Sequence, residues 1–182
     1  MVSDPPSVRL VRPVDRGGYG LDALWNDDFH HSARVAATGR HEGYFHDHRG
    51  HAQEFVSSVK RGFLFQGQHY GWQNQPRGSQ VTDQPAAAFI VFTQNHDQVA
   101  NTLDGRRLTR LTSPGRNRTL TALLLLGPQT PMLFMGQEFA QESEWSEGRS
   151  LDWWLLDNTD HRGVALLVKE LNTVYKATPA LW

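Results

Sequence analysis

The chain has 182 residues, of which 38% are hydrophobic, and its 18 basic residues nearly balance its 19 acidic ones. This size is enough to bury the core of one domain. The near-neutral charge gives no overall field for nucleic acid or a membrane surface, so we expect neither as a partner. The sequence has no cysteine, no apolar stretch of membrane-spanning length and no signal-peptide core at its start, so we expect a soluble, cytoplasmic protein without disulfides.

The first predicted elements are a short strand at residues 21–25, running into a loop with two carboxylates, and a helix at 52–59. Apolar residues recur at three- and four-residue spacing in the helix, which predicts an amphipathic helix that ends near Gly62 and turns Glu54 to solvent. Residues 67–85 are rich in Gln, Gly and Pro and predict a long polar loop.

A continuous apolar run, AAAFIVF at 86–92, predicts a strand buried on both faces, as in a parallel sheet. A helix at 116–127 and a second buried strand at 130–139 follow. The last predicted helix spans 164–175, with Asp160 as its N-terminal cap. Alternating strands and helices, with polar residues after the strands, predict an α/β fold that forms part of a (β/α)8 TIM barrel, whose active site lies at the C-terminal strand ends.

Polar residues directly follow the predicted strand at 86–92. Asn95, His96 and Asp97 are either a catalytic group at a barrel strand end or a hydrogen-bonded cap for the next turn, and the pattern alone leaves both open.

Two histidine-rich segments have the composition of a metal site. In the first, Asp27, Asp28, His30 and His31, the adjacent histidines point apart on a helix, so we expect Asp28 to act as a helix cap and the histidines to be solvated. The second lies in a glycine-containing loop and predicts a solvated turn. Its residues are His46, His48 and His51. We therefore expect no metal site.

Three tryptophans near the C-terminus have two possible roles. They offer flat surfaces for stacking on sugars, but we expect them to pack beneath the last helix. They are Trp145, Trp153 and Trp154.

Several of these segments together resemble a known family. FTQNHDQVAN, GRRL, LTSPGR, LTALLLLGPQTPMLFMGQEFA and GYGLDALWNDDFHHSARVAATGRHEGYF are similar to the malto-oligosyltrehalose trehalohydrolases of the α-amylase superfamily (glycoside hydrolase family 13), over residues 7–140. The resemblance implies strands 5–8 of an eight-stranded barrel. It also implies retaining hydrolysis of the α-1,4 bond that releases trehalose from malto-oligosyl trehalose, with carboxylates alone and therefore without a cofactor.

The resemblance assigns roles to individual residues. Asp97 matches the carboxylate that stabilises the oxocarbenium-like transition state, and His96 matches a neighbouring sugar contact. The expected substrate-binding residues are His96, Gln98, Val99, Ala100, Asn101, Asp27, Asp28, Phe29, His30 and His31.

Two carboxylates of the family pattern have no counterpart in these 182 residues. The resemblance places the nucleophile ahead of residue 1 and the acid/base glutamate near Val2, and Asp4 is a poor substitute for either. Because a retaining glycosidase needs both groups, we expect this chain to be inactive by itself.

The C-terminal part resembles a different family. Residues 141–182 are similar to the 1,4-α-glucan branching enzymes, so the chain is expected to be one partial catalytic domain with a trehalohydrolase-like part, 1–140, and a branching-enzyme-like part. The alternatives are a glucanotransferase fragment or a non-catalytic α-glucan-binding half-barrel. Since a half-barrel exposes strand edges, we expect self-association or a complementing partial barrel.

Overall fold

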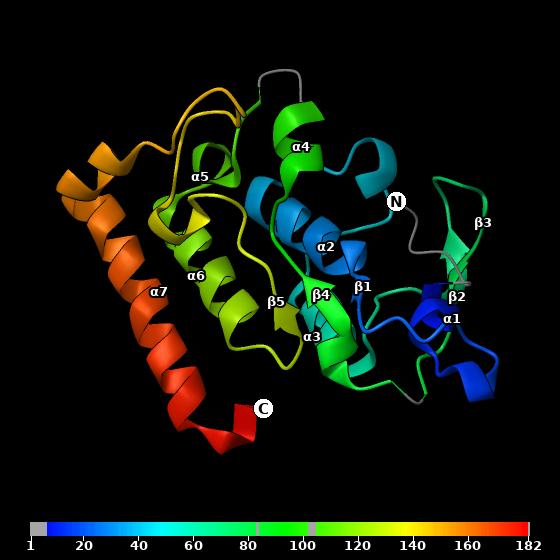
Figure 1. The fold of residues 1–182 in the computed structure, drawn as a ribbon. Coiled ribbons are helices and arrows are strands. Elements are labelled where there is room, and N and C mark those ends of the chain that lie inside the picture. The colour runs from blue at the N-terminus through cyan, green and yellow to red at the C-terminus, as the bar shows by residue number, and fades with distance from the viewer. Residues whose placement is uncertain (1–6, 83, 102–104, 182) are drawn as a thin grey trace. The chain divides into compact units, whose positions relative to one another are not determined.

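The computed structural model describes residues 7–82, 84–101 and 105–181 (Figure 1). The chain divides into two compact units, which are described in turn. Unit 1 contains the described residues up to Val91 together with Pro128–Pro131, and unit 2 contains those of Phe92–Gly127 and from Met132 onward. Within the described ranges, no helix combines the length and the hydrophobicity needed to cross a membrane.

A small parallel sheet organises unit 1. Its strands are β1 (Leu24–Trp25), β4 (Phe89–Val91) and β5 (Thr130–Pro131), in the order β1-β4-β5. The parallel strands at 21–25 and 86–92 are thus confirmed in shortened form. The strand predicted at 130–139 is wrong beyond Pro131, and the chain turns farther on at Gly136, which has a φ of +87°.

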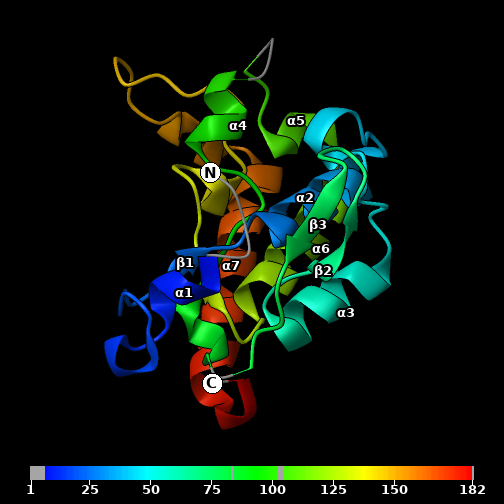
Figure 2. The ribbon, with the colours of Figure 1, turned by 90° about the vertical axis from the view of Figure 1, so that its right-hand side faces the viewer.

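The other elements of unit 1 are helices and one hairpin, visible from a second side in Figure 2. The α-helices are α1 (Ser7–Val11), α2 (Asp27–Thr38) and α3 (Ala52–Arg61), the short 3-10 helices are Val14–Arg16, Gly43–Phe45 and Ala86–Ala88, and the hairpin joins β2 (Gln66–Tyr70) to β3 (Gln75–Gly78). The polar segment predicted as a loop at 67–85 therefore contains an antiparallel hairpin.

The residues after the strand at 21–25 were expected to form a loop and a helix capped by Asp28, whereas helix α2 begins at Asp27, directly after Asn26. Asn26 caps it, since its side-chain oxygen accepts a hydrogen bond from Phe29 N at 3.3 Å, and the predicted cap role of Asp28 is wrong. The helix ends at Gly39, whose φ of +70° is the left-handed conformation that favours glycine at this position.

Helix α3 is confirmed, including its end at Gly62, but the predicted positions of Glu54 and Val56 are wrong. Glu54 is buried, and its carboxylate accepts hydrogen bonds from Arg49 N and Gly50 N at 2.7 Å each. Val56 is 41% exposed instead. The glutamate turns inward because it satisfies the backbone of the preceding loop.

Unit 2 is built mainly from helices. They are α4 (His96–Asn101), α5 (Leu108–Leu111), α6 (Pro114–Leu125) and α7 (Thr159–Ala177), with 3-10 helices at Gln137–Phe139, Trp153–Asp157 and Pro179–Leu181. Helices α6 and α7 pack together, and their inward faces include the buried side chains of Leu124, Val164 and Val168. The helix predicted at 116–127 is confirmed with both ends two residues earlier, and the one predicted at 164–175 is confirmed in extended form. Asn158, not Asp160, caps α7, because its side chain accepts a hydrogen bond from Asp160 N at 2.8 Å.

Two of the three C-terminal tryptophans do not pack beneath the last helix. Trp153 is 54% and Trp154 67% exposed, and the Trp153 ring contacts Phe139 with centroids 5.1 Å apart. Trp145 contacts Phe134 at 6.5 Å. The packing prediction is therefore wrong for Trp153 and Trp154.

Candidate functional site

Asp97 lies in the first turn of α4, shortly after strand β4. Its backbone N–H donates to Asn95 Oδ1 at 2.8 Å, and Asn95 N donates to Gln98 Oε1 at 2.8 Å. The Asp97 carboxylate lies 3.2 Å from His96 Nε2, with side-chain exposures of 47% and 52%. Asn95 and Gln98 supply the capping interactions, so the carboxylate and imidazole are left facing solvent, where a ligand can reach them.

Buried polar side chains hold the backbone beneath this pair. Gln94 Oε1 accepts a hydrogen bond from Leu108 N at 2.8 Å, and Gln137 Nε2 donates to Thr93 Oγ1 at 2.7 Å. All three polar side chains are buried. They join the segment after β4 to α5 and to the 3-10 helix Gln137–Phe139, which fixes the base of α4. The sequence analysis did not identify them.

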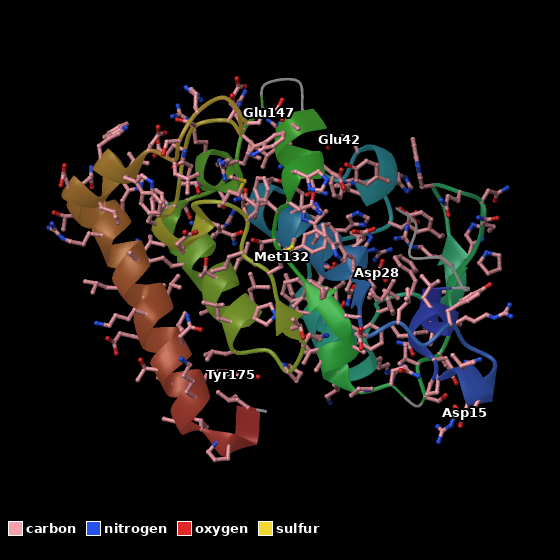
Figure 3. All side chains as sticks on the ribbon, viewed as in Figure 1. Asp15, Asp28, Glu42, Met132, Glu147 and Tyr175 are labelled. Atoms are coloured by element: carbon pink, nitrogen blue, oxygen red, sulfur yellow. The ribbon has the colours of Figure 1, made fainter. Side chains whose placement is uncertain are left out.

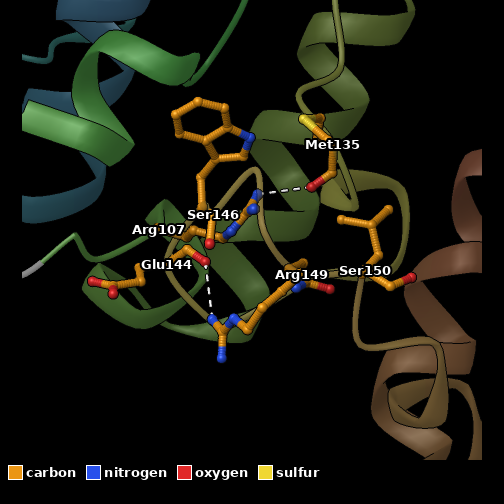
Figure 4. Close-up of a pocket in the computed structure, with 9 residues that line it drawn as sticks. Arg107, Met135, Glu144, Ser146, Arg149 and Ser150 are labelled. Carbon is orange, nitrogen blue, oxygen red and sulfur yellow. Dashed lines mark hydrogen bonds between the residues drawn. The ribbon is translucent and has the colours of Figure 1, made fainter.

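Arg107 is a second residue that the sequence analysis missed. It is 1% exposed, and its guanidinium donates to Ser143 O at 2.6 Å. It also donates to Met135 O at 2.8 Å, as Figure 4 shows. The guanidinium also lies over the Phe134 ring, 5.4 Å from its centroid. Burial lowers the pKa of Arg107 from its usual value, against the opposite effect of nearby carboxylates.

Phe134 links this arginine to the exposed pair. Its ring centroid lies 6.5 Å from that of His96 and 6.5 Å from that of Trp145. Arg107 thus supports an aromatic group that packs beside His96. A polar hollow of about 350 Å³ lies in the same unit, and its lining residues are Gly105, Arg106, Arg110, Glu142, Ser143 and Glu144.

Unit 1 contains a buried polar cluster around Asp28, at the start of α2 (Figure 3). Asp28 Oδ2 accepts hydrogen bonds from Leu64 N and Phe65 N, each at 3.0 Å, and Oδ1 accepts one from Arg77 Nη2 at 3.2 Å. Arg77 also lies over the Tyr70 ring, 4.4 Å from its centroid. Burial raises the pKa of Asp28, although the Arg77 charge and the two backbone amides act to lower it.

Two histidines complete this cluster. His31 Nδ1 lies 3.3 Å from His48 Nε2, and His48 Nδ1 lies 3.4 Å from Ser32 Oγ. Burial, and then the neighbouring positive charges, lower the pKa of His48 to about 3 and that of His31 well below its ordinary value, so both imidazoles are neutral at pH 7. The solvated positions expected for His30, His31 and His48 are wrong, because all three are buried.

The residues predicted to bind substrate occupy two places. Asp28, Phe29, His30 and His31 are buried on α2 in unit 1, while Asp27 is partly exposed there. On α4 in unit 2, Ala100 is exposed and Val99 is 1% exposed. Asn101 ends α4, and its side chain lies outside the described part, as do Val2 and Asp4. The roles of the α2 and α4 residues as substrate contacts stay predictions.

Comparison with known proteins identifies relatives. A malto-oligosyltrehalose trehalohydrolase from Saccharolobus solfataricus is 38% identical over 141 residues, covering 78% of this chain and 25% of that protein. One from Brevibacterium helvolum is 37% identical over 145 residues, covering 79% and 24%. The 1,4-alpha-glucan branching enzyme GlgB 1 from Streptomyces coelicolor is 46% identical over 104 residues, covering 50% of this chain and 13% of that enzyme. No protein-family model matches the chain.

A solved structure resembles the chain as well. The crystal structure of a protein described as an α-amylase, from Salmonella typhimurium, matches with a TM-score of 0.76 and 28% identity, covering 85% of this chain and 33% of that one. The mixed α/β fold is therefore shared with that protein.

The chain spans about a quarter of the length of the trehalohydrolases that it matches. The branching-enzyme match covers half of the chain, which is more than residues 141–182 contain, so that similarity extends ahead of Gln141. Both resemblances seen in the sequence are confirmed. The chain is a relative of the malto-oligosyltrehalose trehalohydrolases within the α-amylase superfamily.

Proposed function

We propose that this chain forms part of an α-glucan-acting glycoside hydrolase of the trehalohydrolase type, namely strands 5–8 of a (β/α)8 barrel with their helices. The parallel order β1-β4-β5 and the similarity to an α-amylase structure support this architecture. In this proposal residues 1–140 are the trehalohydrolase-like part, and residues 141–182 complete the same catalytic domain.

The observation that carries the functional proposal is the exposed Asp97–His96 pair on a backbone held by buried side chains. A carboxylate that stabilises an oxocarbenium-like transition state must reach sugar hydroxyls and must also be fixed in position. Asp97 meets both needs, since its side chain is 47% exposed and its N–H is bound by Asn95. We therefore assign Asp97 to transition-state stabilisation and His96 to a sugar contact.

Residues 1–182 by themselves are proposed to bind α-glucan without cleaving it. One carboxylate cannot act as nucleophile, as acid/base group and as stabiliser of the transition state at once. In a protein that also supplies the other two carboxylates, the same residues would assist the release of trehalose from malto-oligosyl trehalose.

The test combines binding and turnover on the 182-residue chain. Isothermal titration with malto-oligosyl trehalose is expected to show binding, which Asp97→Asn weakens about tenfold, because hydrogen bonds to a charged group are worth roughly 1.5–3 kcal/mol. Asp157→Asn, which removes an exposed carboxylate elsewhere in unit 2, is the matched control and should leave binding unchanged. Equal affinities of wild type and Asp97→Asn would contradict a direct contact between Asp97 and the sugar.

Product analysis separates the alternatives. Released trehalose would show that the chain is a competent hydrolase and would contradict the proposed inactivity. New α-1,6 branches in amylose would favour a glucanotransferase of the branching-enzyme type, the second candidate supported by 46% identity over half of the chain. Binding without either product is the expected result.

A further inference from the structure

We propose that Asp28, His31 and His48 form a binding site for one transition-metal cation, with Zn²⁺ as the representative ion. Each residue offers one ligand atom, and the three atoms lie within 4.8 Å of one another. Asp28 and His31 are three residues apart on α2 and so share a helix face, while His48 comes from the segment ahead of α3. This inference does not depend on the proposed function.

The distance between the two imidazoles fits a shared metal ion. In a tetrahedral zinc site with Zn–N bonds of about 2.0–2.1 Å, two ligand nitrogens lie roughly 3.3–3.4 Å apart. His31 Nδ1 and His48 Nε2 are 3.3 Å apart. The same separation also lies within hydrogen-bonding distance of two imidazole nitrogens, so a bound ion would replace this contact without moving the two nitrogens apart.

The chemistry of the donors selects the class of ion. Two imidazole nitrogens and one carboxylate suit zinc and its neighbours, whereas calcium and magnesium take mainly oxygen ligands. Asp28 would supply the third ligand through Oδ1, which it would share with Arg77 Nη2, while Oδ2 keeps its two backbone hydrogen bonds. Three protein ligands leave a fourth position for water.

The surroundings hold the ligands in place. His48 directs its second nitrogen toward Ser32 Oγ at 3.4 Å, as metal-bound histidines direct theirs toward an oxygen. The ring of His31 packs against Phe45 with centroids 5.1 Å apart, and that of His48 packs against Phe65 at 5.4 Å. These contacts restrict the movement of both imidazole rings.

The positive charge of Arg77 should weaken the binding of a cation, and this effect provides a specific test. Its Nη2 lies 3.2 Å from Asp28 Oδ1, so a bound cation must share the carboxylate with a guanidinium. Replacing Arg77 by a neutral residue of similar length should therefore strengthen metal binding. Adsorption of zinc on surface histidines would not respond in this way.

The experiment uses the full chain after chelator treatment, with ZnCl₂ as titrant in isothermal calorimetry. One equivalent is expected to bind. His31→Asn and His48→Asn should each weaken binding by about tenfold or more, since even outer-sphere changes cost about 10–100-fold. Arg77→Met should tighten it severalfold. The matched control His46→Asn, which removes a side chain that is 63% exposed, should have no effect.

Cobalt substitution provides a test on the unmodified chain, independent of whether the variants fold. Co²⁺ in the proposed site should give the intense visible absorption of tetrahedral coordination, and circular dichroism will establish which variants are folded. The proposal is overturned by absence of zinc binding, by the weak absorption of octahedral cobalt, or by binding that His46→Asn abolishes and His31→Asn leaves intact.

Discussion

The ion pair of Asp28 and Arg77 allows a quantitative prediction for Asp28→Asn. The two side chains are 1% and 6% exposed. The carboxylate accepts three hydrogen bonds, two from the backbone at Leu64 and Phe65 and one from Arg77. An asparagine can keep the two backbone bonds through its carbonyl oxygen, but its NH₂ group then faces the guanidinium, which places two donors opposite each other.

The magnitude follows from what remains buried in the variant. Removing one partner of a buried ion pair typically costs about 3–5 kcal/mol, because the other charge is left uncompensated. Two effects favour the lower end: a neutral amide is easier to bury than the carboxylate, whose pKa burial already raises, and Arg77 keeps its contact with the Tyr70 ring. We therefore expect Asp28→Asn to lower the free energy of unfolding by about 3 kcal/mol.

Urea unfolding followed by far-UV circular dichroism measures this loss. The control is Arg110→Gln, which breaks an ion pair with Glu142 whose side chains are 56% and 41% exposed and which should cost less than about 1 kcal/mol. The double variant Asp28→Asn, Arg77→Met removes the stranded cation and should be more stable than Asp28→Asn alone. Equal losses in Asp28→Asn and Arg110→Gln, or no recovery in the double variant, would refute the reasoning.

Three further predictions concern stability. Folding lowers the pKa of His48 from 6.5 to about 3, so between these values the unfolded chain binds a proton that the folded chain does not. Acidification from pH 7 to 5 should therefore lower the free energy of unfolding by about 2 kcal/mol through His48, as measured by urea titration. The loss should be smaller in His48→Asn. Gly78→Ala should lower the melting temperature more than Gly67→Ala. Both glycines have a positive φ, but a Cβ added at Gly78 would lie 1.9 Å from a carbonyl oxygen, whereas a Cβ added at Gly67 would have no neighbour within 4 Å. Leu124 is fully buried, so Leu124→Ala should lower the free energy of chemical unfolding by about 2–5 kcal/mol. Leu123 is 45% exposed, and Leu123→Ala should lower it by less than about 1 kcal/mol. Similar losses in the two variants would contradict the packing described for α6.

Local patterns in the sequence predicted several elements correctly. The apolar run at 86–92 and the three- and four-residue spacings at 52–59 and 164–175 locate β4, α3 and α7. In α7 the spacing reflects burial of one face, which includes Val164 and Val168. The same criterion overextends the strand at 130–139. Its apolar residues suit a strand, but Gly136 turns the chain within the run.

The sequence did not predict that the polar residues of helix α2 are buried. Asp28 and His31 lie inside only because partners elsewhere satisfy them, and Arg77 is 49 residues away from Asp28 in the sequence. A pattern search treats such residues as solvent-facing. Pairings over that distance are set by the fold, so no local signal predicts them.

The candidate site was predicted only in its exposed part. The motif around Asp97 identified that carboxylate and its neighbour, whose use in catalysis stays a prediction. Arg107 was missed because its partners are the backbone carbonyls of Met135 and Ser143, and any residue type presents such a carbonyl. The burial of an arginine can be identified only from its neighbours in the folded structure.

The polar interior around α2 has a consequence for how this sequence can diverge. The cluster contains a carboxylate, an arginine and two imidazoles that interact with one another. Replacing one of them alone leaves a buried charge or hydrogen-bond donor without a partner. The aliphatic contacts between α6 and α7 tolerate stepwise replacement among residues of similar volume. During evolution the polar residues around α2 should therefore be replaced together or be retained, whereas the aliphatic residues between α6 and α7 can be replaced singly. We expect the two regions of the chain to accumulate substitutions at different rates.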